Sequence, residues 1–166
     1  MNRKLFFLLF CLFVVMIGFG VTLPVLPFYV RHLHTNVGTS REMMAIHISL
    51  LTSIYALAQF IFAPFWGQCS DRVGRRPLIL LGIAGSAIAQ VLFGLASSLA
   101  MLYVVRAIGG VLSSATLPAA TAYISDITPE RDRSRNMAWL STAVSLGIIV
   151  GPAFGGLTTR EDLHFM

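Results

Sequence analysis

The sequence contains few charged residues. Only 11% of its 166 residues are Asp, Glu, Lys or Arg, whereas 56% are hydrophobic, and the mean hydropathy is +0.78. Soluble domains carry about 25% charged residues, so we expect a chain of this composition to be surrounded by lipid. The net charge of +5 does not indicate a nucleic-acid partner, because the arginines occur in short clusters between apolar runs and not along one basic face.

Cysteine and metal-ligand patterns are also scarce. The two cysteines, Cys11 and Cys69, offer no disulfide framework, and we expect both to be free thiols. His32 and His34 lie one residue apart in a polar loop, where solvation is a simpler interpretation than metal binding. The sequence therefore predicts no metal, no cofactor and no enzymatic activity.

Long apolar runs are abundant instead. Crossing a bilayer takes about 20 mostly apolar residues, and a helix pairs every backbone group within such a segment. We predict an all-α bundle of five transmembrane helices at about 5–30, 45–66, 78–97, 99–124 and 137–157, followed by a polar tail at 158–166. The beginning of the chain also resembles a signal peptide, but its apolar run continues too far and lacks a small-x-small cleavage site, so we interpret it as a retained span.

The basic residues predict the orientation of these spans. Arginine and lysine in short loops accumulate on the cytoplasmic side. An amino terminus inside the cell puts eight basic residues in the cytoplasm: Arg3, Lys4, Arg72, Arg75, Arg76, Arg131, Arg133 and Arg135. Only Arg31, Arg41 and Arg160 then lie outside. We therefore expect a multi-pass protein of the inner or plasma membrane with a cytoplasmic amino terminus.

The segment Gly67-Gln68-Cys69-Ser70-Asp71-Arg72-Val73-Gly74-Arg75-Arg76 joins the second and third spans. Its glycines allow a tight chain reversal at a helix end. We expect Asp71 near the start of the third helix, where a carboxylate meets the positive end of the helix dipole. The arginines can interact with lipid phosphates. A generic cytoplasmic loop is the alternative interpretation.

The spacing G-x-x-x-D-R-x-G-R-R resembles motif A of the major facilitator superfamily. The resemblance implies a conformational latch that helps to hold the outward-open state, formed here by Gly67, Asp71, Arg72, Gly74, Arg75 and Arg76. Cys69 stands where this family more often has leucine.

Arg106 lies about seven residues inside the predicted fourth span. A charge within a span marks an ion or substrate pathway, although a long side chain can also extend to the membrane surface. Arg106 and Gly110 match the R-x-x-x-G pattern of the same superfamily, which implies that Arg106 contributes to proton transfer by tuning a nearby carboxylate. None of the five predicted spans contains an acidic residue, so that carboxylate would come from elsewhere.

Glycines recur every four residues in the fifth span, at Gly147, Gly151 and Gly155. They share one helix face, which allows another helix to approach closely, and Pro152 is expected to bend the helix. Together with Gly156 they resemble motif C, the antiporter motif, which is found mainly in exporters that exchange their substrates for protons. An ordinary packing face is the alternative.

Weaker features support the same resemblance. Gly18 precedes Pro24 and Pro27 at a spacing typical of drug-proton antiporters, although paired prolines can also simply end a helix. The loop residues Asp126 and Arg135 are candidates for an ionic network with Asp71, or for a solvated loop. The polar residues of the spans are expected chiefly to connect helices by hydrogen bonds: Thr22, Tyr55, Gln59 and Gln90.

The resemblance covers residues 5–157 and implies transport by alternating access between two six-span halves. We expect this chain to be the front part of a proton-coupled multidrug or small-molecule efflux antiporter, with lipid, substrate and protons as partners. The sixth span and the second half are absent from it, so we expect no transport by the chain alone and no partner helix for the glycine face. No phosphate-binding loop of the G-x-x-x-x-G-K-[ST] type occurs, so uphill transport would use an ion gradient. An importer of the same fold and a non-transporting truncated membrane protein are the alternatives.

Overall fold

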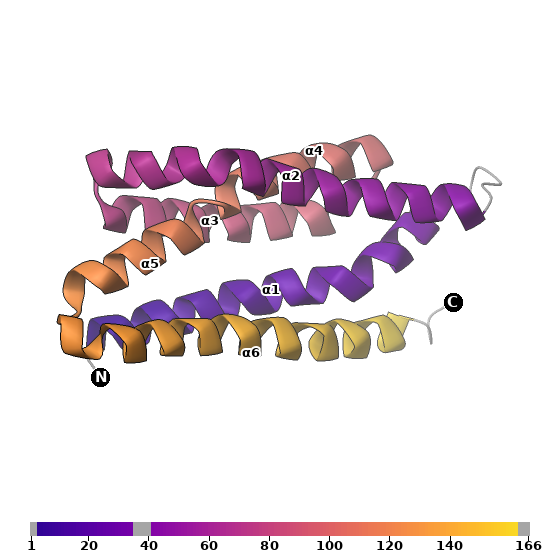
Figure 1. Cartoon of the computed structure of the whole chain (residues 1–166). Coiled ribbons are helices and arrows are strands. Elements are labelled where there is room, and N and C mark those ends of the chain that lie inside the picture. The colour runs from indigo at the N-terminus through magenta and orange to yellow at the C-terminus, as the bar shows by residue number, and fades with distance from the viewer. Residues whose placement is uncertain (1–2, 35–40, 163–166) are drawn as a thin grey trace.

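The computed structural model describes residues 3–34 and 41–162, and every regular element in these residues is a helix (Figure 1). The helices are α1 (Arg3–His34), α2 (Arg41–Val73), α3 (Arg75–Gly94), α4 (Leu99–Ser113), α5 (Thr116–Ile127) and α6 (Glu130–Asp162). Five helical stretches of this part of the chain are long and apolar enough to cross a membrane, with α4 and α5 together forming the fourth. The all-α fold class with five spans is therefore confirmed.

Two helices, α2 and α6, extend well beyond the apolar runs that predicted them. Helix α2, the predicted second span, begins at Arg41 and ends at Val73. Helix α6, the predicted fifth span, begins at Glu130, seven residues before the predicted boundary of 137. Acidic residues occupy the first turn in both cases, Glu42 in α2 and Glu130 and Asp132 in α6. Their carboxylates stabilise the positive ends of the helix dipoles, so the helices continue into polar sequence.

The predicted fourth span is divided in two. Helix α4 begins at Leu99 and ends at Ser113, and the residue before it, Ser98, caps it by accepting a hydrogen bond from the backbone N–H of Met101. Helix α5 begins at Thr116. Pro118 explains the break, because its ring clashes with the carbonyl four residues earlier, that of Ser114, and it has no N–H to donate there.

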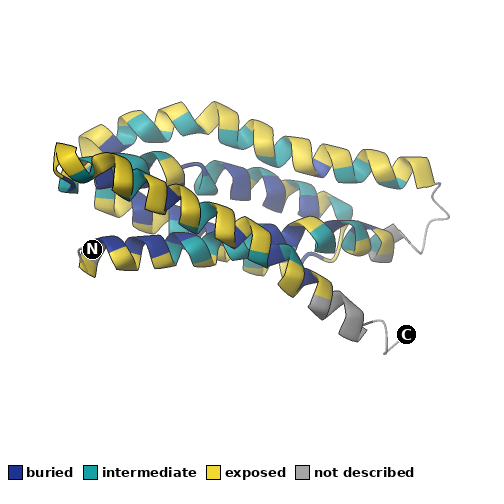
Figure 2. Ribbon diagram, turned by 60° about the horizontal axis from the view of Figure 1, so that its bottom comes forward, coloured by how far each residue is buried: buried dark blue, intermediate teal, exposed yellow. Residues whose placement is uncertain are grey.

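Two groups of helices enclose the interior (Figure 1). Helices α1 and α6 lie side by side and run in the same direction, whereas α2, α3 and α4 form the other layer and α5 crosses towards the α1–α6 pair. The outward faces of the helices are exposed (Figure 2), and many of their exposed residues are large and apolar, with Phe60 of α2 80% exposed. Such a surface suits contact with lipid.

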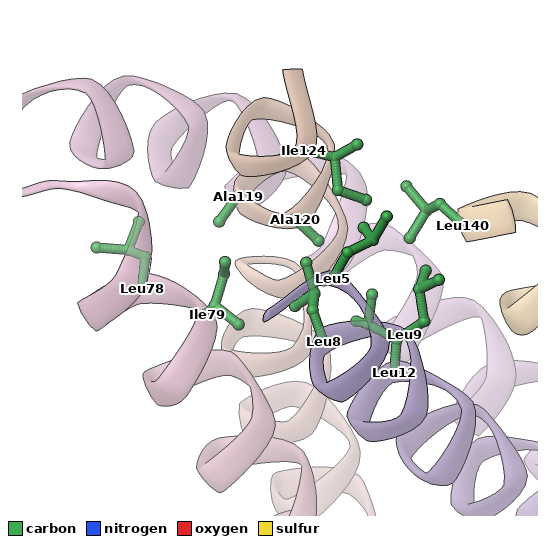
Figure 3. Close-up of a cluster of buried hydrophobic side chains, with 10 residues drawn as sticks. All are labelled: Leu5, Leu8, Leu9, Leu12, Leu78, Ile79, Ala119, Ala120, Ile124 and Leu140. Carbon is green, nitrogen blue, oxygen red and sulfur yellow. The ribbon is translucent and has the colours of Figure 1, made fainter. Parts of the chain in front are cut away.

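Apolar packing closes the bundle at both ends. At one end, α1, α3, α5 and α6 contribute the cluster drawn in Figure 3, which contains Leu5, Leu8, Leu9, Leu12, Leu78, Ile79, Ala119, Ala120, Ile124 and Leu140. A second cluster at the other end consists of Leu26, Val30, Leu51, Phe93, Ala96, Leu102 and Val105. Polar side chains of the spans gather between the two clusters, which places the candidate site near the middle of the bundle.

Candidate functional site

The glycine face of α6 packs directly against α1. A Cβ atom on Gly147 would lie 2.5 Å from Met16 Cβ, and one on Gly151 would lie 2.5 Å from Gly20 Cα. A Cβ atom on Gly155 would lie 2.9 Å from Pro24 Cγ. The expectation that this face lacks a partner helix is therefore wrong. Gly156 lies off this contact, with nothing within 4 Å of a Cβ placed there.

The prolines of α1 lie inside the helix. Pro24 and Pro27 are followed by helix as far as His34, so the interpretation of a plain helix stop is wrong. Each proline removes a backbone hydrogen bond, and α1 bends in its second half (Figure 1). Pro152 also lies inside its helix, α6, and packs against Gly20 of α1. Gly18, one turn before Thr22, faces the side chain of Gln90 across the bundle.

The reversal between α2 and α3 depends on a single glycine. Gly74 has φ +104° and ψ 154° and is the only residue between the two helices. Asp71 lies in the last turn of α2, so its expected position near the start of the third helix is wrong. Gly67 is likewise inside α2, and a Cβ atom added to it would have no atom within 4 Å. Arg72 is exposed beside Asp71.

Arg75, the first residue of α3, connects three helices through ion pairs. Its guanidinium forms an ion pair with Asp71 of α2 and another, at 3.0 Å, with Asp126 of α5. It also donates a hydrogen bond to the buried Ser70 Oγ at 3.2 Å. Three helix ends are thereby held at one end of the bundle.

The other basic residues of this end make different contacts. The Arg76 guanidinium lies 5.9 Å from the ring of Tyr123 in α5. Arg135 pairs with Asp132 on its own helix at 3.1 Å, and not with Asp71 as expected. The network around Arg75 therefore includes Asp126, and the Arg135–Asp132 pair is separate from it.

Arg106 of α4 is buried inside the bundle, with 6% of its surface exposed. Snorkelling to the membrane surface is therefore wrong for this residue. Its guanidinium lies 5.0 Å from the ring centre of Phe93 and 5.5 Å from that of Tyr55. Each ring contributes about 0.5 to 2 kcal/mol, compared with about 2.5 to 3.5 kcal/mol that a mid-span arginine costs on insertion scales. The two rings together thus contribute about 1 to 4 kcal/mol, which is comparable to the cost of burying this charge.

A cavity of about 180 Å³ surrounds the head of Arg106. Side chains from all six helices line it, among them Thr22, Tyr55, Gln59, Gln90, Ser113 and Thr116. The four polar residues selected from the sequence therefore meet in one place, although they are scattered along three spans. A mostly apolar lining with a few convergent polar groups resembles that of ligand sites, although the cavity is smaller than the roughly 300 Å³ at which such sites begin.

Hydrogen bonds between helices orient these side chains. The hydroxyl groups of Tyr55 and Ser113 lie 2.9 Å apart, and Gln59 Nε2 donates to Ser113 Oγ at 3.1 Å. Thr22 Oγ1 lies 3.0 Å from Gln90 Oε1. The expected helix–helix bonds are present, and the same residues line the cavity.

Gly110 brings α2 and α4 together beside this cavity. A Cβ atom on Gly110 would lie 2.6 Å from the backbone oxygen of Tyr55 and 2.8 Å from Ala58 Cβ. The close approach positions the Tyr55 ring near Arg106. Gly110 therefore acts as a packing residue for the site.

Sequence reasoning missed most of the other residues that line the cavity, among them Ser113, Phe93 and Thr116. Ser113 follows Arg106 by seven residues, so helix periodicity places both on one face of α4, and this signal was present in the sequence. Phe93 and Thr116 carried no comparable signal. No cluster of His, Cys, Asp or Glu suited to a metal ion occurs among the described residues, and the side chains of His32 and His34 lie outside that set.

A bundle of spanning helices around a cavity with a buried arginine defines a multi-pass membrane protein. The chain belongs to the major facilitator superfamily, whose family model matches residues 8–163. It is thereby a member of a family of transporters, and the resemblance found in its motifs is confirmed at the level of the family.

Similar proteins include two that are named for drug resistance and one that is named as a transporter. The chain is 36% identical over 145 residues to Multidrug resistance protein 2 of Bacillus subtilis (strain 168), covering 87% of this chain and 34% of that protein. It is 30% identical over 156 residues to the Quinolone resistance protein NorA of Staphylococcus aureus (strain Mu50 / ATCC 700699), covering 94% and 38%. The crystal structure of the human organic anion transporter MFSD10 (TETRAN) superposes with a TM-score of 0.75 at 26% identity, covering 94% and 42%. The chain thus spans between a third and about two fifths of the length of these proteins.

Proposed function

We propose that these residues form the amino-terminal part of a proton-coupled efflux antiporter for small, amphiphilic molecules. The observation that carries this proposal is the seam of Gly147, Gly151 and Gly155 against α1. That seam is where the chain matches the antiporter motif, and it rigidly joins two of the helices that line the central cavity. The similarity to two proteins named for drug resistance supports the same direction of transport.

The proposal gives the ion-pair network around Arg75 and the buried Arg106 separate roles. The Asp71–Arg75–Asp126 network acts as a latch that holds α2, α3 and α5 together in one conformational state and releases them in the other. The energy for transport comes from the proton gradient. Arg106 participates in coupling through an anion that comes from outside the described residues.

The orientation is part of the proposal. The end that carries Arg3, the α2–α3 turn and the α5–α6 turn faces the cytoplasm, because basic residues of short loops accumulate there. The cavity then lies near the middle of the inner or plasma membrane, where transporters of this kind bind substrate between their two halves. We propose that the chain requires a second helical bundle for alternating access.

Dye efflux tests the proposal. Cells that express the complete reading frame containing these residues are loaded with ethidium, and the loss of fluorescence is followed before and after the proton gradient is collapsed. Export that stops with the gradient supports the antiporter. Uptake in place of export would indicate an importer, and export that survives the collapse would contradict proton coupling.

The same cells separate the transporter from a non-transporting protein. Expression of residues 1–166 alone is expected to give no export above that of the empty vector. Export by this chain alone would contradict the requirement for a second bundle. No export from either form of the protein would favour a non-transporting membrane protein.

A further inference from the structure

The head of Arg106 offers two unpaired donors to the central cavity. Its Nε and Nη2 atoms are buried and have no hydrogen-bond acceptor among the described residues. These two atoms form one edge of the guanidinium plane. That edge binds a carboxylate by two parallel hydrogen bonds.

Most of the neighbouring polar groups are already engaged with one another. Tyr55 and Ser113 bond to each other, and Thr22 pairs with Gln90. The hydroxyl of Thr116 is also buried and unpaired, and no hydrogen bond joins any of these side chains to the arginine edge. Burial makes an unpaired charged donor costly, so this edge is suited to an incoming anion.

No acidic side chain of the described residues is positioned to fill this role. Those that the structure describes lie at helix ends: Glu42, Asp71, Asp126, Glu130 and Asp132. Arg106 lies inside α4, between the two apolar clusters. The anion that neutralises it therefore comes from outside this set of residues.

The walls around the arginine are aromatic. Phe93 and Tyr55 both lie within cation–π distance of the guanidinium, and the ring of Phe19 stacks on Tyr55 with centroids 5.5 Å apart. Flat rings of this kind favour stacking with another aromatic group. A ligand that combines a ring with an acid matches both features of the cavity.

We propose that Arg106 binds the carboxylate of a transported aromatic acid, so that anionic or zwitterionic aromatic compounds are the substrate class of this cavity. The inference rests on the proposed function only in treating the cavity as part of the transport route. An acidic side chain from another part of the transporter offers the same chemistry. The experiment therefore compares ligands that differ only in their carboxylate.

The probes are 2-naphthoate and its neutral isostere 2-naphthamide. Their binding to the 166-residue chain in lipid nanodiscs is measured by equilibrium dialysis, and their efflux is measured from cells expressing the complete reading frame. The variants are Arg106→Gln, Arg106→Lys and the matched surface control Arg133→Gln, which removes an exposed charge at the start of α6. Circular dichroism verifies that each variant is helical.

We expect naphthoate to bind about tenfold or more tightly than naphthamide, since hydrogen bonds to charged groups are among the strongest. Arg106→Gln is expected to abolish this preference and Arg106→Lys to retain part of it, because lysine keeps the charge and loses the planar fork. Arg133→Gln is expected to leave the preference unchanged.

Two results would overturn the inference. Equal binding of both probes by the unmodified chain, or binding of neither, would show that the cavity does not select a carboxylate. Equal loss of naphthoate and naphthamide efflux in Arg106→Gln would show that Arg106 pairs with an acid of the protein itself. Failure of the proposed function has a different signature, in which no probe or dye is exported even though the naphthoate preference is present in nanodiscs.

Discussion

Gly151 of α6 and Gly20 of α1 lie back to back, so close that a Cβ atom on Gly151 would lie 2.5 Å from the Cα atom of Gly20. Two backbones meet here without an intervening side chain. Helices in lipid have no water to exclude from between them, so the hydrophobic effect does not drive their association. Close van der Waals packing of this kind contributes instead. The α1–α6 pair therefore depends on the absence of side chains along this line.

Replacement of Gly151 by alanine is expected to destabilise the bundle. The added methyl group meets backbone, which cannot move aside as a flexible side chain would, and overpacking of this kind costs about 1 to 3 kcal/mol. Thermal unfolding in detergent, followed by circular dichroism, measures the change. Gly156→Ala is the matched control, because its added carbon meets nothing within 4 Å. Equal unfolding temperatures for the two variants would contradict the glycine seam.

Alanine substitutions at Gly74 and Gly67 are expected to have opposite effects on stability, because only Gly74 forms the turn between α2 and α3. Gly74→Ala is expected to cost about 1 to 3 kcal/mol, because its φ of +104° with ψ of 154° is a backbone conformation almost confined to glycine. Gly67→Ala is expected to stabilise α2 by about 0.5 to 1 kcal/mol, since Gly67 lies within the helix in open space. Thermal unfolding of both variants tests the assignment, and destabilisation by Gly67→Ala would place the turn elsewhere.

The latch predicts an unequal effect of two acidic residues. Asp126→Asn is expected to reduce efflux by the complete transporter several times more than Asp132→Asn, because only Asp126 connects α5 to Arg75 of α3. Loss of either partly exposed ion pair is expected to change stability by less than about 1 kcal/mol. Similar efflux by the two variants at matched expression would show that the Arg75 network is structural only.

The orientation is tested by cysteine accessibility. In a background with Cys11→Ser and Cys69→Ser, single cysteines are introduced by Ser134→Cys and Ser97→Cys, two exposed positions at opposite ends of the bundle. Ser134 follows the α5–α6 turn and Ser97 lies between α3 and α4. A maleimide that cannot cross the membrane is expected to label position 97 in intact cells and position 134 only after lysis. The reverse pattern would invert the proposed topology.

Much of the site was predictable one helix at a time. The four-residue spacing of Gly147, Gly151 and Gly155 indicated a shared helix face, and the structure has that face. What the face contacts was not predictable, and the expectation of a missing partner failed because α1 fills that place. Periodicity reports which side chains share a direction and carries no information about the neighbour in that direction.

For Arg106 and Asp71 as well, the sequence left open a position that only the tertiary contacts decided. The position of Arg106 within an apolar run was compatible both with burial and with extension to the surface, and the packing of Phe93 and Tyr55 around it decided for burial. Asp71 was expected at the start of a helix because two glycines flank it, yet of those two only Gly74 has a left-handed backbone. Local sequence does not distinguish a glycine that turns the chain from one that a helix simply tolerates.

The amino-acid sequence by itself determined that this protein is a set of five apolar helices, because lipid requires long apolar segments with internally paired backbone groups. It also determined which residues are chemically unusual there, since charge and glycine are rare in such segments. Only the tertiary structure decided that α1 receives the glycines of α6, that Arg75 links Asp71 to Asp126, and that six helices enclose Arg106 in one cavity. These contacts join residues far apart in the chain, and they form because side-chain shape and hydrogen bonding select among the many ways in which apolar helices can pack in lipid.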